Sequence, residues 1–286
     1  SAAPTRRIYW LPRAGVSGII PGPAEDYRMR RGPGQGLPGA ALSVRIRPMS
    51  PADRLIVALD VNSREAALAL CAALRPKVRH YKVGLELFTA CGPDLVRDLL
   101  RAGAQVFLDL KLHDIPNTAA RAAVEAARLG VGMFTIHLSG GPLMARRVAD
   151  EVTTHCEIHR APRPRILGVT VLTSLEQQDL ASVGVTRPLE DQVAALAEMA
   201  LQAGLDGVVA SPREVARLRS VLGPEMTIVT PGVRLTGSDS QDQARTLTPH
   251  EAIANGADYI VAGRPILSAR DPLEAAETIL LQIEGR

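Results

Sequence analysis

QVFLDLKLHDIPNTAARAAVEAARLGVGMFTIHL, residues 105–138, contains one complete unit of the pattern that decides the fold. A short run rich in branched apolar residues opens it, and an Ala- and Arg-rich segment follows. Pro116 stands near the start of that segment, where a helix does not need the missing N–H. Gly130 follows its end, where a left-handed cap is favoured, and a second apolar run begins at Met133. The unit therefore predicts strand, helix, strand.

The same unit recurs from Arg54 to the end of the chain. Helical periodicity marks the segments between the apolar runs, such as 63–74 and 190–204. Alternating strands and helices imply parallel strands, and eight of them can close into a (β/α)8 barrel, the TIM barrel of the α/β class. A doubly wound open sheet is the alternative, but RLIVALDVNS (54–63) lacks its usual Gly-rich fingerprint. The eight predicted strands are 54–60, 80–87, 105–111, 133–138, 166–172, 207–211, 227–232 and 259–263.

The first 50 residues differ in composition from the rest. They are rich in Pro, Gly and Arg, and their eight Arg and two acidic residues give a net charge of +6. Because the whole chain carries +3, residues 51–286 carry −3, which argues against a nucleic-acid partner. We expect a disordered extension over 1–50, with a targeting peptide as the alternative, and a single barrel domain over 51–286.

The remaining composition points to a cytoplasmic protein. No apolar run approaches the roughly 18 residues that a membrane span needs, so no membrane partner is expected. The three cysteines are widely separated and lack metal-ligand spacing. They are interpreted as reduced structural thiols.

Charged residues gather where the first three predicted strands end. Asp60 follows the first strand, Lys82 lies in the second, and Asp109 and Lys111 end the third. Chemistry in such barrels takes place at the carboxyl ends of the strands, and residues i and i+2 of a strand face the same side. Asp109 and Lys111 are therefore expected to point together into the barrel mouth, with Asp114 in the loop beyond.

Lysine is scarce in this chain, which has 30 Arg and only three Lys. Two of the three, Lys82 and Lys111, fall on predicted strands among carboxylates. Lys can surrender a proton near neutral pH when its pKa is tuned, whereas Arg cannot. The pattern favours a functional ammonium over ordinary ion pairing, which is the alternative for any single Lys–Asp pair.

The last two predicted strands end in glycine-containing loops, TPGVR (230–234) and AGRPI (262–266). Loops at these two places commonly hold a phosphate in this fold, and Arg264 adds a bidentate cationic group. These two loops therefore predict a phosphorylated small-molecule substrate. In the alternative interpretation, Gly232 and Gly263 are needed only for the turns in which they lie.

From about Arg54 to Ile283 the chain resembles the orotidine 5′-phosphate decarboxylase family in its bacterial form. FLDLKLHDIPNT (107–118) is the most specific of the shared motifs. Leu235 departs from the family, in which Pro often follows the Arg of TPGVR. The other shared motifs, in chain order, are LDV (59–61), YKVGLELF (81–88), TIHLSGG (135–141), VTVLTSL (169–175), TPGVR (230–234), SDSQDQAR (238–245) and GADYIVAGRPI (256–266).

The resemblance implies decarboxylation of orotidine 5′-monophosphate to UMP without a cofactor or a metal. Lys111 would stabilise and protonate the carbanion-like C6 centre, and Asp109 would lie beside the substrate carboxylate. Asp60 and Lys82 would bind the ribose hydroxyls and complete an alternating array of charges.

The resemblance also implies a homodimer and a set of binding residues. Asp114 and Thr118 would reach into the neighbouring subunit's site, and Thr173 lies in the region that contacts the pyrimidine edge. The phosphate-binding set would be Arg234, Gln243, Gly263 and Arg264, with residues 236–243 as a closing lid.

Two other functions remain open. A Mg2+-dependent sugar-phosphate barrel enzyme, of the hexulose-phosphate synthase or keto-gulonate-phosphate decarboxylase type, shares Asp-x-Lys-x-x-Asp. Those enzymes carry a metal-binding Glu where this chain has Lys82. A non-catalytic barrel whose basic extension recruits a partner is the second. His113 and His137 are interpreted as structural, and His155 and His159 as lacking the ligands for a metal.

Overall fold

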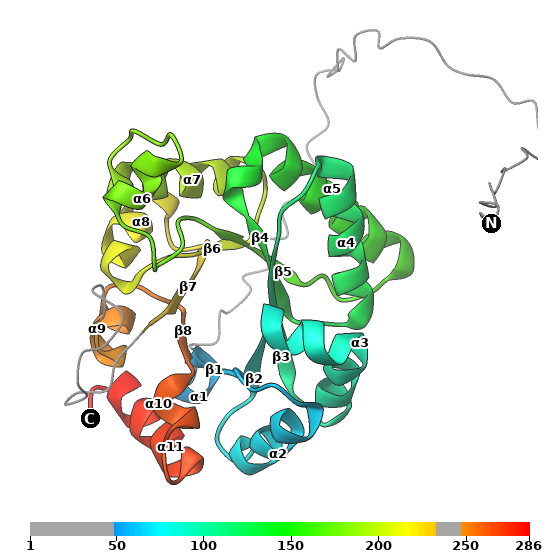
Figure 1. Ribbon diagram of the computed structural model, residues 1–286, viewed down its shortest axis with the longest axis vertical. Helices are drawn as coiled ribbons and strands as arrows, with labels where there is room; N and C mark the ends of the chain where they lie inside the picture. Colours follow the sequence, from blue (N-terminus) through cyan, green and yellow to red (C-terminus); the bar gives the residue numbers. More distant parts are fainter. Residues whose placement is uncertain (1–48, 233–246) are drawn as a thin grey trace, which may run out of the picture. The chain divides into compact units, whose positions relative to one another are not determined.

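Eight parallel strands close into a barrel in the computed structural model, which describes residues 49–232 and 247–286. Each strand pairs with the next along the chain, and β1 pairs with β8 (Figure 1). The strands are β1 (Leu55–Ala58), β2 (His80–Gly84), β3 (Gln105–Leu112), β4 (Met133–His137), β5 (Arg165–Val169), β6 (Gly207–Val209), β7 (Thr227–Pro231) and β8 (Tyr259–Ala262). The expected (β/α)8 barrel is confirmed.

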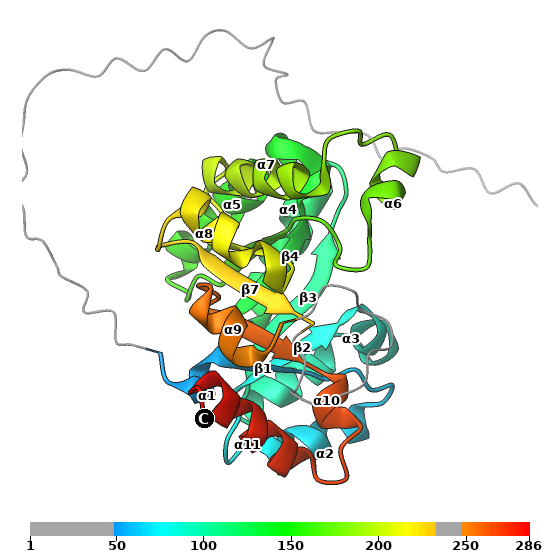
Figure 2. The same ribbon diagram turned by 90° about the vertical axis from the view of Figure 1, so that its left-hand side faces the viewer.

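Helices surround the strands on the outside of the barrel (Figure 1). Helix α11 packs against α2, so the last helix completes the ring beside the first units (Figure 2). The helices are α1 (Pro51–Arg54), α2 (Arg64–Leu74), α3 (Leu85–Arg101), α4 (Pro116–Leu129), α5 (Gly141–His159), α6 (Gln177–Ser182), α7 (Leu189–Gln202), α8 (Val215–Leu222), α9 (Pro249–Ala254), α10 (Arg264–Leu267) and α11 (Pro272–Ile283), with 3-10 turns η1 (Leu138–Gly140) and η2 (Pro212–Glu214).

The strands are buried on both faces, as parallel strands between helices must be. A small apolar cluster that includes Phe107, Leu167 and Val261 fills the interior, and a much larger one joins the strands to the helices. Alanine, valine, leucine and isoleucine supply most of both clusters. The low aromatic content of the chain is therefore compatible with a closed, well-filled barrel.

Local sequence signals place most of the element boundaries. Gly130 ends α4 with a left-handed backbone (φ 84°), and Pro116 occupies its first turn. The second predicted strand, 80–87, is too long, because β2 ends at Gly84 and residues 85–87 form the first turn of α3. Apolar residues continue across that junction, since Leu87 is buried as part of the helix.

The barrel reaches slightly further toward the N-terminus than residue 51. Met49 packs against the interior cluster, and the Ser50 hydroxyl hydrogen-bonds the Asp53 carboxylate at the start of α1. The remainder of the predicted extension, residues 1–48, lies outside the described residues.

Two further sequence expectations concern thiols and membranes. Cys71, Cys91 and Cys156 are all free. Among the helices of 49–232 and 247–286, none is long and apolar enough to cross a membrane.

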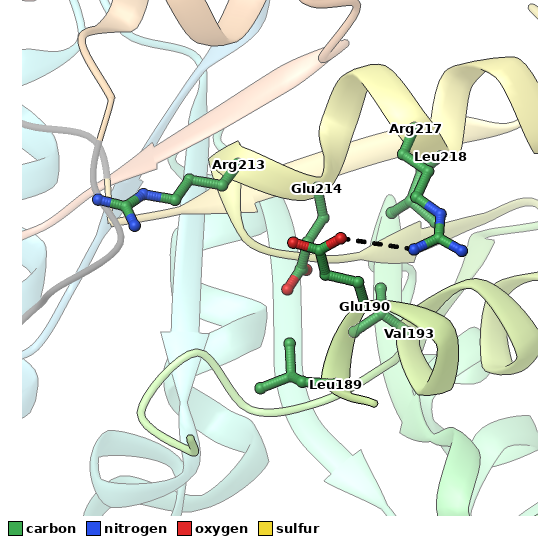
Figure 3. Close-up of a pocket in the computed structure, with 7 residues that line it drawn as sticks. All are labelled: Leu189, Glu190, Val193, Arg213, Glu214, Arg217 and Leu218. Atoms are coloured by element: carbon green, nitrogen blue, oxygen red, sulfur yellow. Dashed lines mark ion pairs between the residues drawn. The ribbon is translucent and has the colours of Figure 1, made fainter. Parts of the chain in front are cut away.

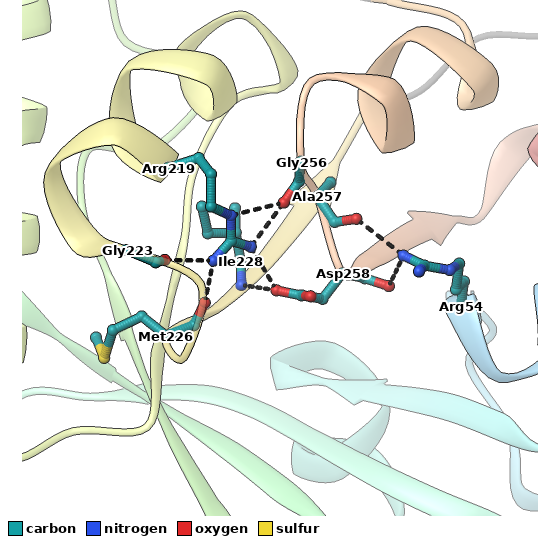
Figure 4. Close-up of polar contacts among 8 residues, drawn as sticks. All are labelled: Arg54, Arg219, Gly223, Met226, Ile228, Gly256, Ala257 and Asp258. Carbon is teal, nitrogen blue, oxygen red and sulfur yellow. Dashed lines mark hydrogen bonds and ion pairs between the residues drawn. The ribbon is translucent and has the colours of Figure 1, made fainter. Parts of the chain in front are cut away.

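A partly buried polar network ties the last two strands to α8, the helix between β6 and β7. The Asp258 carboxylate accepts the Ile228 N–H (2.8 Å) and a hydrogen bond from Arg219 (2.7 Å). Arg219 also donates to backbone carbonyls of Gly256, Gly223 and Met226 (Figure 4). One guanidinium thus satisfies several backbone acceptors that the strand ladder leaves unpaired.

Replacing this guanidinium should destabilise the barrel. Arg219→Ala leaves the Asp258 carboxylate, whose side chain is 31% exposed, without its cation and frees three carbonyls. We expect a loss of about 2–3 kcal/mol in the free energy of unfolding, which lowers the thermal midpoint by roughly 4–10 °C.

Arg217→Ala is the matched control on the same helix. Arg217 forms ion pairs with Asp191 and Glu190 at the surface, so its removal should leave the thermal midpoint within about 2 °C of wild type. Equal midpoints for the two variants would contradict the role of the Arg219 network.

Candidate active site

Four side chains of alternating charge form a row at the carboxyl ends of β1, β2 and β3. Lys82 Nζ lies 3.3 Å from Asp60 Oδ1 and 3.7 Å from Asp109 Oδ2. Lys111 Nζ lies 3.0 Å from both carboxylate oxygens of Asp109. The structure thus brings these four predicted residues together in the order Asp60, Lys82, Asp109, Lys111, which we term the charge row.

The middle of the charge row is shielded and its ends reach solvent. The side chains of Lys82 and Asp109 are 14% and 13% exposed, whereas those of Asp60 and Lys111 are 53% and 37% exposed. A shielded charge is stabilised by neighbours of opposite sign, and Lys82 and Asp109 each have two such neighbours in the row. A ligand entering the barrel mouth would meet the two outer groups first.

Strand β3 is irregular where it carries the row. Leu108 pairs with Phe134, but the next pairing joins Leu112 to Ile136, so β3 has extra residues opposite β4. The backbone of Lys111, within this irregular segment, is left-handed (φ 51°), a conformation that few non-glycine residues adopt. The side chains of Asp109 and Lys111 converge through a bulge, and not through the regular strand that the sequence predicts.

Two glycines allow the backbone to pass close to the row. A Cβ atom at Gly84 would lie 3.1 Å from Lys82 Nζ, and one at Gly263 would lie 3.0 Å from Asp60 Oδ2. Gly263 caps α10, and Arg264 is the exposed first residue of that helix. The loop after β8, predicted to bind phosphate, therefore lies directly beside Asp60.

Thr135 is a member of the site that sequence reasoning missed. It is completely buried on β4, and its hydroxyl donates to Asp109 Oδ1 (2.9 Å). The same hydroxyl accepts the backbone N–H of Lys111 (2.9 Å). A polar residue inside the apolar run MFTIHL was the available signal.

Other predicted residues lie outside the charge row. Asp114 and Thr118 are exposed at the start of α4, and the Asp114 carboxylate accepts the N–H of Ile115 (2.6 Å). Within the described part of this chain, Asp114 forms no ion pair with the row. Thr173 is half-buried in the turn after β5. Arg234, Gln243 and the predicted lid (236–243) lie outside the described residues.

Two histidines stack beside the row. The rings of His113 and His137 are 5.5 Å apart and nearly parallel. His137 Nδ1 accepts the Ser139 N–H (3.3 Å), which favours the neutral ring. Burial, with smaller contributions from His113 and Lys111, lowers the pKa of His137 below its ordinary 6.5.

A pocket of about 240 Å³ lies away from the row, between α7 and α8. Leu189, Val193 and Leu218 line it, and Glu190 and Arg217 form an ion pair across it (3.6 Å; Figure 3). It contains none of the charge-row residues, and the Glu190–Arg217 ion pair lies at the surface. The charge row is therefore the stronger candidate for chemistry.

Over residues 49–232 and 247–286, no group of three or more His, Cys, Asp or Glu is placed to hold a metal ion.

Comparison with known proteins identifies relatives over almost the whole barrel. Residues 53–279 match the family model described as "Orotidine 5'-phosphate decarboxylase / HUMPS family". Orotidine 5′-phosphate decarboxylase of Syntrophotalea carbinolica is 51% identical over 227 residues, covering 79% of this chain and 93% of that protein. The Moorella thermoacetica protein of the same name is 50% identical, and the match covers 82% of this chain and 94% of that protein.

Solved structures agree with the sequence relatives. The crystal structure of orotidine 5′-phosphate decarboxylase from Lactobacillus acidophilus superposes with a TM-score of 0.72 at 37% identity, covering 81% of this chain and 99% of that one. The crystal structure of an uncharacterized conserved protein from Geobacillus kaustophilus superposes with a TM-score of 0.70 at 35% identity. The match covers 80% of this chain and 99% of that one.

The environment of His137 predicts a stability that depends on pH. Its folded-state pKa lies below the unfolded value near 6.5, so the unfolded chain binds the proton first as pH falls. This residue therefore costs no stability above about pH 6.5 and reduces the free energy of unfolding as pH falls from there toward its folded pKa.

Urea unfolding at pH 7.5 and 5.5 checks this expectation. The loss of stability between the two pH values should be smaller in His137→Gln than in wild type, while both proteins are compared at constant salt. A ring titration by NMR with a midpoint at or above 6.5 would contradict it.

Proposed function

This chain belongs to the orotidine 5′-phosphate decarboxylase family, and from that premise we propose that it converts orotidine 5′-monophosphate to UMP and CO2. The charge row is the observation that carries the proposal. In the reaction the bond between C6 and the carboxylate breaks, CO2 departs and the electron pair stays on C6. A proton then adds to C6 to give UMP, so one proton is consumed for each CO2 released.

Lys111 supplies that proton in this proposal. Its ammonium is held by Asp109 at 3.0 Å and is 37% exposed, so it is both fixed in direction and open to the barrel mouth. A fixed cation stabilises negative charge that develops on C6, and the same group is a general acid. Solvent then restores the ammonium proton.

Asp109, Asp60 and Lys82 bind the substrate in this proposal. The substrate carboxylate lies beside Asp109, and the repulsion between the two anions is relieved when CO2 leaves. Asp60 and Lys82 bind the ribose hydroxyls. The 53% exposed side chain of Asp60 is suited to this contact.

We assign phosphate binding to the part of the mouth beside Asp60, at the other end of the charge row from Lys111. Arg264 begins a short helix directly after Gly263, which lies against Asp60. We assign the phosphate to Arg264 and Gly263 together with Arg234 and Gln243, and closure to residues 236–243. Binding energy gained at the phosphate can then be used at C6. Thr173 is assigned to the pyrimidine edge.

The proposal includes a homodimer in which each subunit completes its neighbour's site. Asp114 and Thr118 are exposed and separate from the row of their own chain, as the arrangement requires. Apolar side chains at the starts of three neighbouring helices support a partner there: Leu85 (63% exposed), Ile115 (67%) and Leu143 (75%). A twofold interface would bury them.

We place the reaction in the cytoplasm and without a cofactor or metal. Lys82 occupies the end of β2, where the sugar-phosphate enzymes carry a metal-binding Glu, and an ammonium there opposes a cation. The catalytic unit is the barrel from residue 51 onward, together with Met49 and Ser50. The intact charge row argues against the non-catalytic alternative.

Removing the Lys111 ammonium should abolish turnover. For Lys111→Ala we expect kcat for the loss of orotidine 5′-monophosphate absorbance to fall at least about 10⁴-fold, because charge stabilisation and proton donation are both lost. Lys77→Ala is the matched control, since Lys77 forms an ion pair with Glu277 at the surface (2.9 Å) and is not part of the charge row. A Lys111→Ala variant as active as Lys77→Ala would refute the mechanism.

Metal chelation separates the proposal from the Mg2+-dependent alternative. Activity should be the same before and after dialysis against EDTA, and added Mg2+ should not raise it. Loss of activity that Mg2+ restores would favour the sugar-phosphate enzymes, and testing hexulose and keto-gulonate phosphates would then identify the substrate.

Mixing two inactive variants tests the shared site. In a mixed dimer of Lys111→Ala and Asp114→Asn subunits, one site has both defects and the other has neither. With random exchange half of the dimers are mixed, so roughly one quarter of wild-type activity should return. If the mixture stays as inactive as its components after exchange has been verified, Asp114 does not act across the interface.

A further inference from the structure

We propose that Thr135 is a positioning residue for the charge row, an inference that rests on the proposed function. Its hydroxyl makes two hydrogen bonds of 2.9 Å, donating to Asp109 Oδ1 and accepting the N–H of Lys111. Lys111 Nζ in turn donates to Asp109 Oδ1 at 3.0 Å. The three residues therefore form a closed ring of hydrogen bonds around one carboxylate oxygen.

The ring stands where the β3–β4 ladder is interrupted. Regular pairing stops at Leu108 with Phe134 and resumes at Leu112 with Ile136, and Thr135 is the only β4 residue between those pairings. The Lys111 N–H cannot use a ladder carbonyl there, so the Thr135 hydroxyl replaces it. A buried N–H without an acceptor would be unfavourable.

The strained backbone of Lys111 gives this hydrogen bond its importance. Lys111 and Arg160 are the two non-glycine residues with positive φ in 49–232 and 247–286. Such a conformation persists when surrounding contacts hold it, and it often occurs at functional sites. Thr135 holds the backbone of Lys111 and the carboxylate that pairs with its ammonium, so it sets the position of both reacting charges.

Thr135 acts through other residues and does not itself meet the substrate. It is completely buried, and its single donor is directed at Asp109. Its effect should therefore appear in kcat and in the geometry of Lys111, while binding of the product, which lacks the carboxylate, should change little.

Three variants separate the hydroxyl from the packing. Thr135→Val keeps the shape and removes both hydrogen bonds, and Thr135→Ser keeps the hydroxyl. Thr170→Val is the matched control, since Thr170 is similarly buried just after β5 and its hydroxyl donates to the Val209 carbonyl (3.1 Å). Should Thr135→Val fail to fold, Thr135→Ala makes the same comparison.

Turnover and product binding give the first result. We expect Thr135→Val to lower kcat about 10- to 100-fold with the UMP dissociation constant within about threefold of wild type. Thr135→Ser and Thr170→Val should both stay within about threefold of wild-type kcat. The proposal is overturned if Thr135→Val keeps the wild-type kcat, or if Thr135→Ser is as slow as Thr135→Val. It is also overturned if Thr135→Val loses as much affinity for UMP as it loses in kcat.

Crystal structures give a second result that does not depend on activity. In Thr135→Val, Lys111 should leave the left-handed region and its Nζ should move away from Asp109, whereas Thr135→Ser should keep φ positive. Unchanged Lys111 geometry in Thr135→Val would overturn the proposal. If wild type fails to decarboxylate orotidine 5′-monophosphate, the proposed function fails, and this comparison still decides the role of Thr135 in positioning Lys111.

Discussion

Electrostatic alternation is the constraint on which the site depends. Two carboxylates and two ammonium groups lie within hydrogen-bonding or ion-pairing distance of one another, and Lys82 separates Asp60 from Asp109. Without that ammonium the Asp60 and Asp109 carboxylates would have no cation between them, and like charges repel. The order of the charges therefore gives each group in the barrel mouth a neighbour of opposite sign.

The barrel supplies this order through its connectivity. Consecutive strands are neighbours in a parallel barrel, so residues at the ends of β1, β2 and β3 become adjacent although 51 positions separate Asp60 from Lys111 in the chain. Gly84 and Gly263 let the backbone pass near the charges, and Thr135 holds the irregular end of β3. The Arg219 network ties together the starts of β7 and β8, at the opposite ends of the strands from the charge row.

The sequence predicted the eight strands, the closed barrel and the four charged residues, because each depends on local periodicity or on position at a strand end. It did not predict the bulge at Lys111, since no pattern of side chains marks a left-handed residue that is not glycine. Thr135 was missed for a different reason: it stands out as a polar residue in an apolar run, but its partners lie on a neighbouring strand, where no local pattern indicates them. The end of β2 at Gly84 was misplaced because apolar residues continue from the strand into α3.

A double-mutant cycle on Asp60 and Lys82 tests the central claim that the charge row acts as a unit. The measurement is kcat/KM for orotidine 5′-monophosphate in wild type, Asp60→Asn, Lys82→Met and the double variant. Because each single change removes one oppositely charged neighbour from its partner, we predict that the double variant loses much less activity than the product of the two single losses, by a coupling of at least about 1 kcal/mol. Losses that multiply would show that the two residues act independently and would contradict the account.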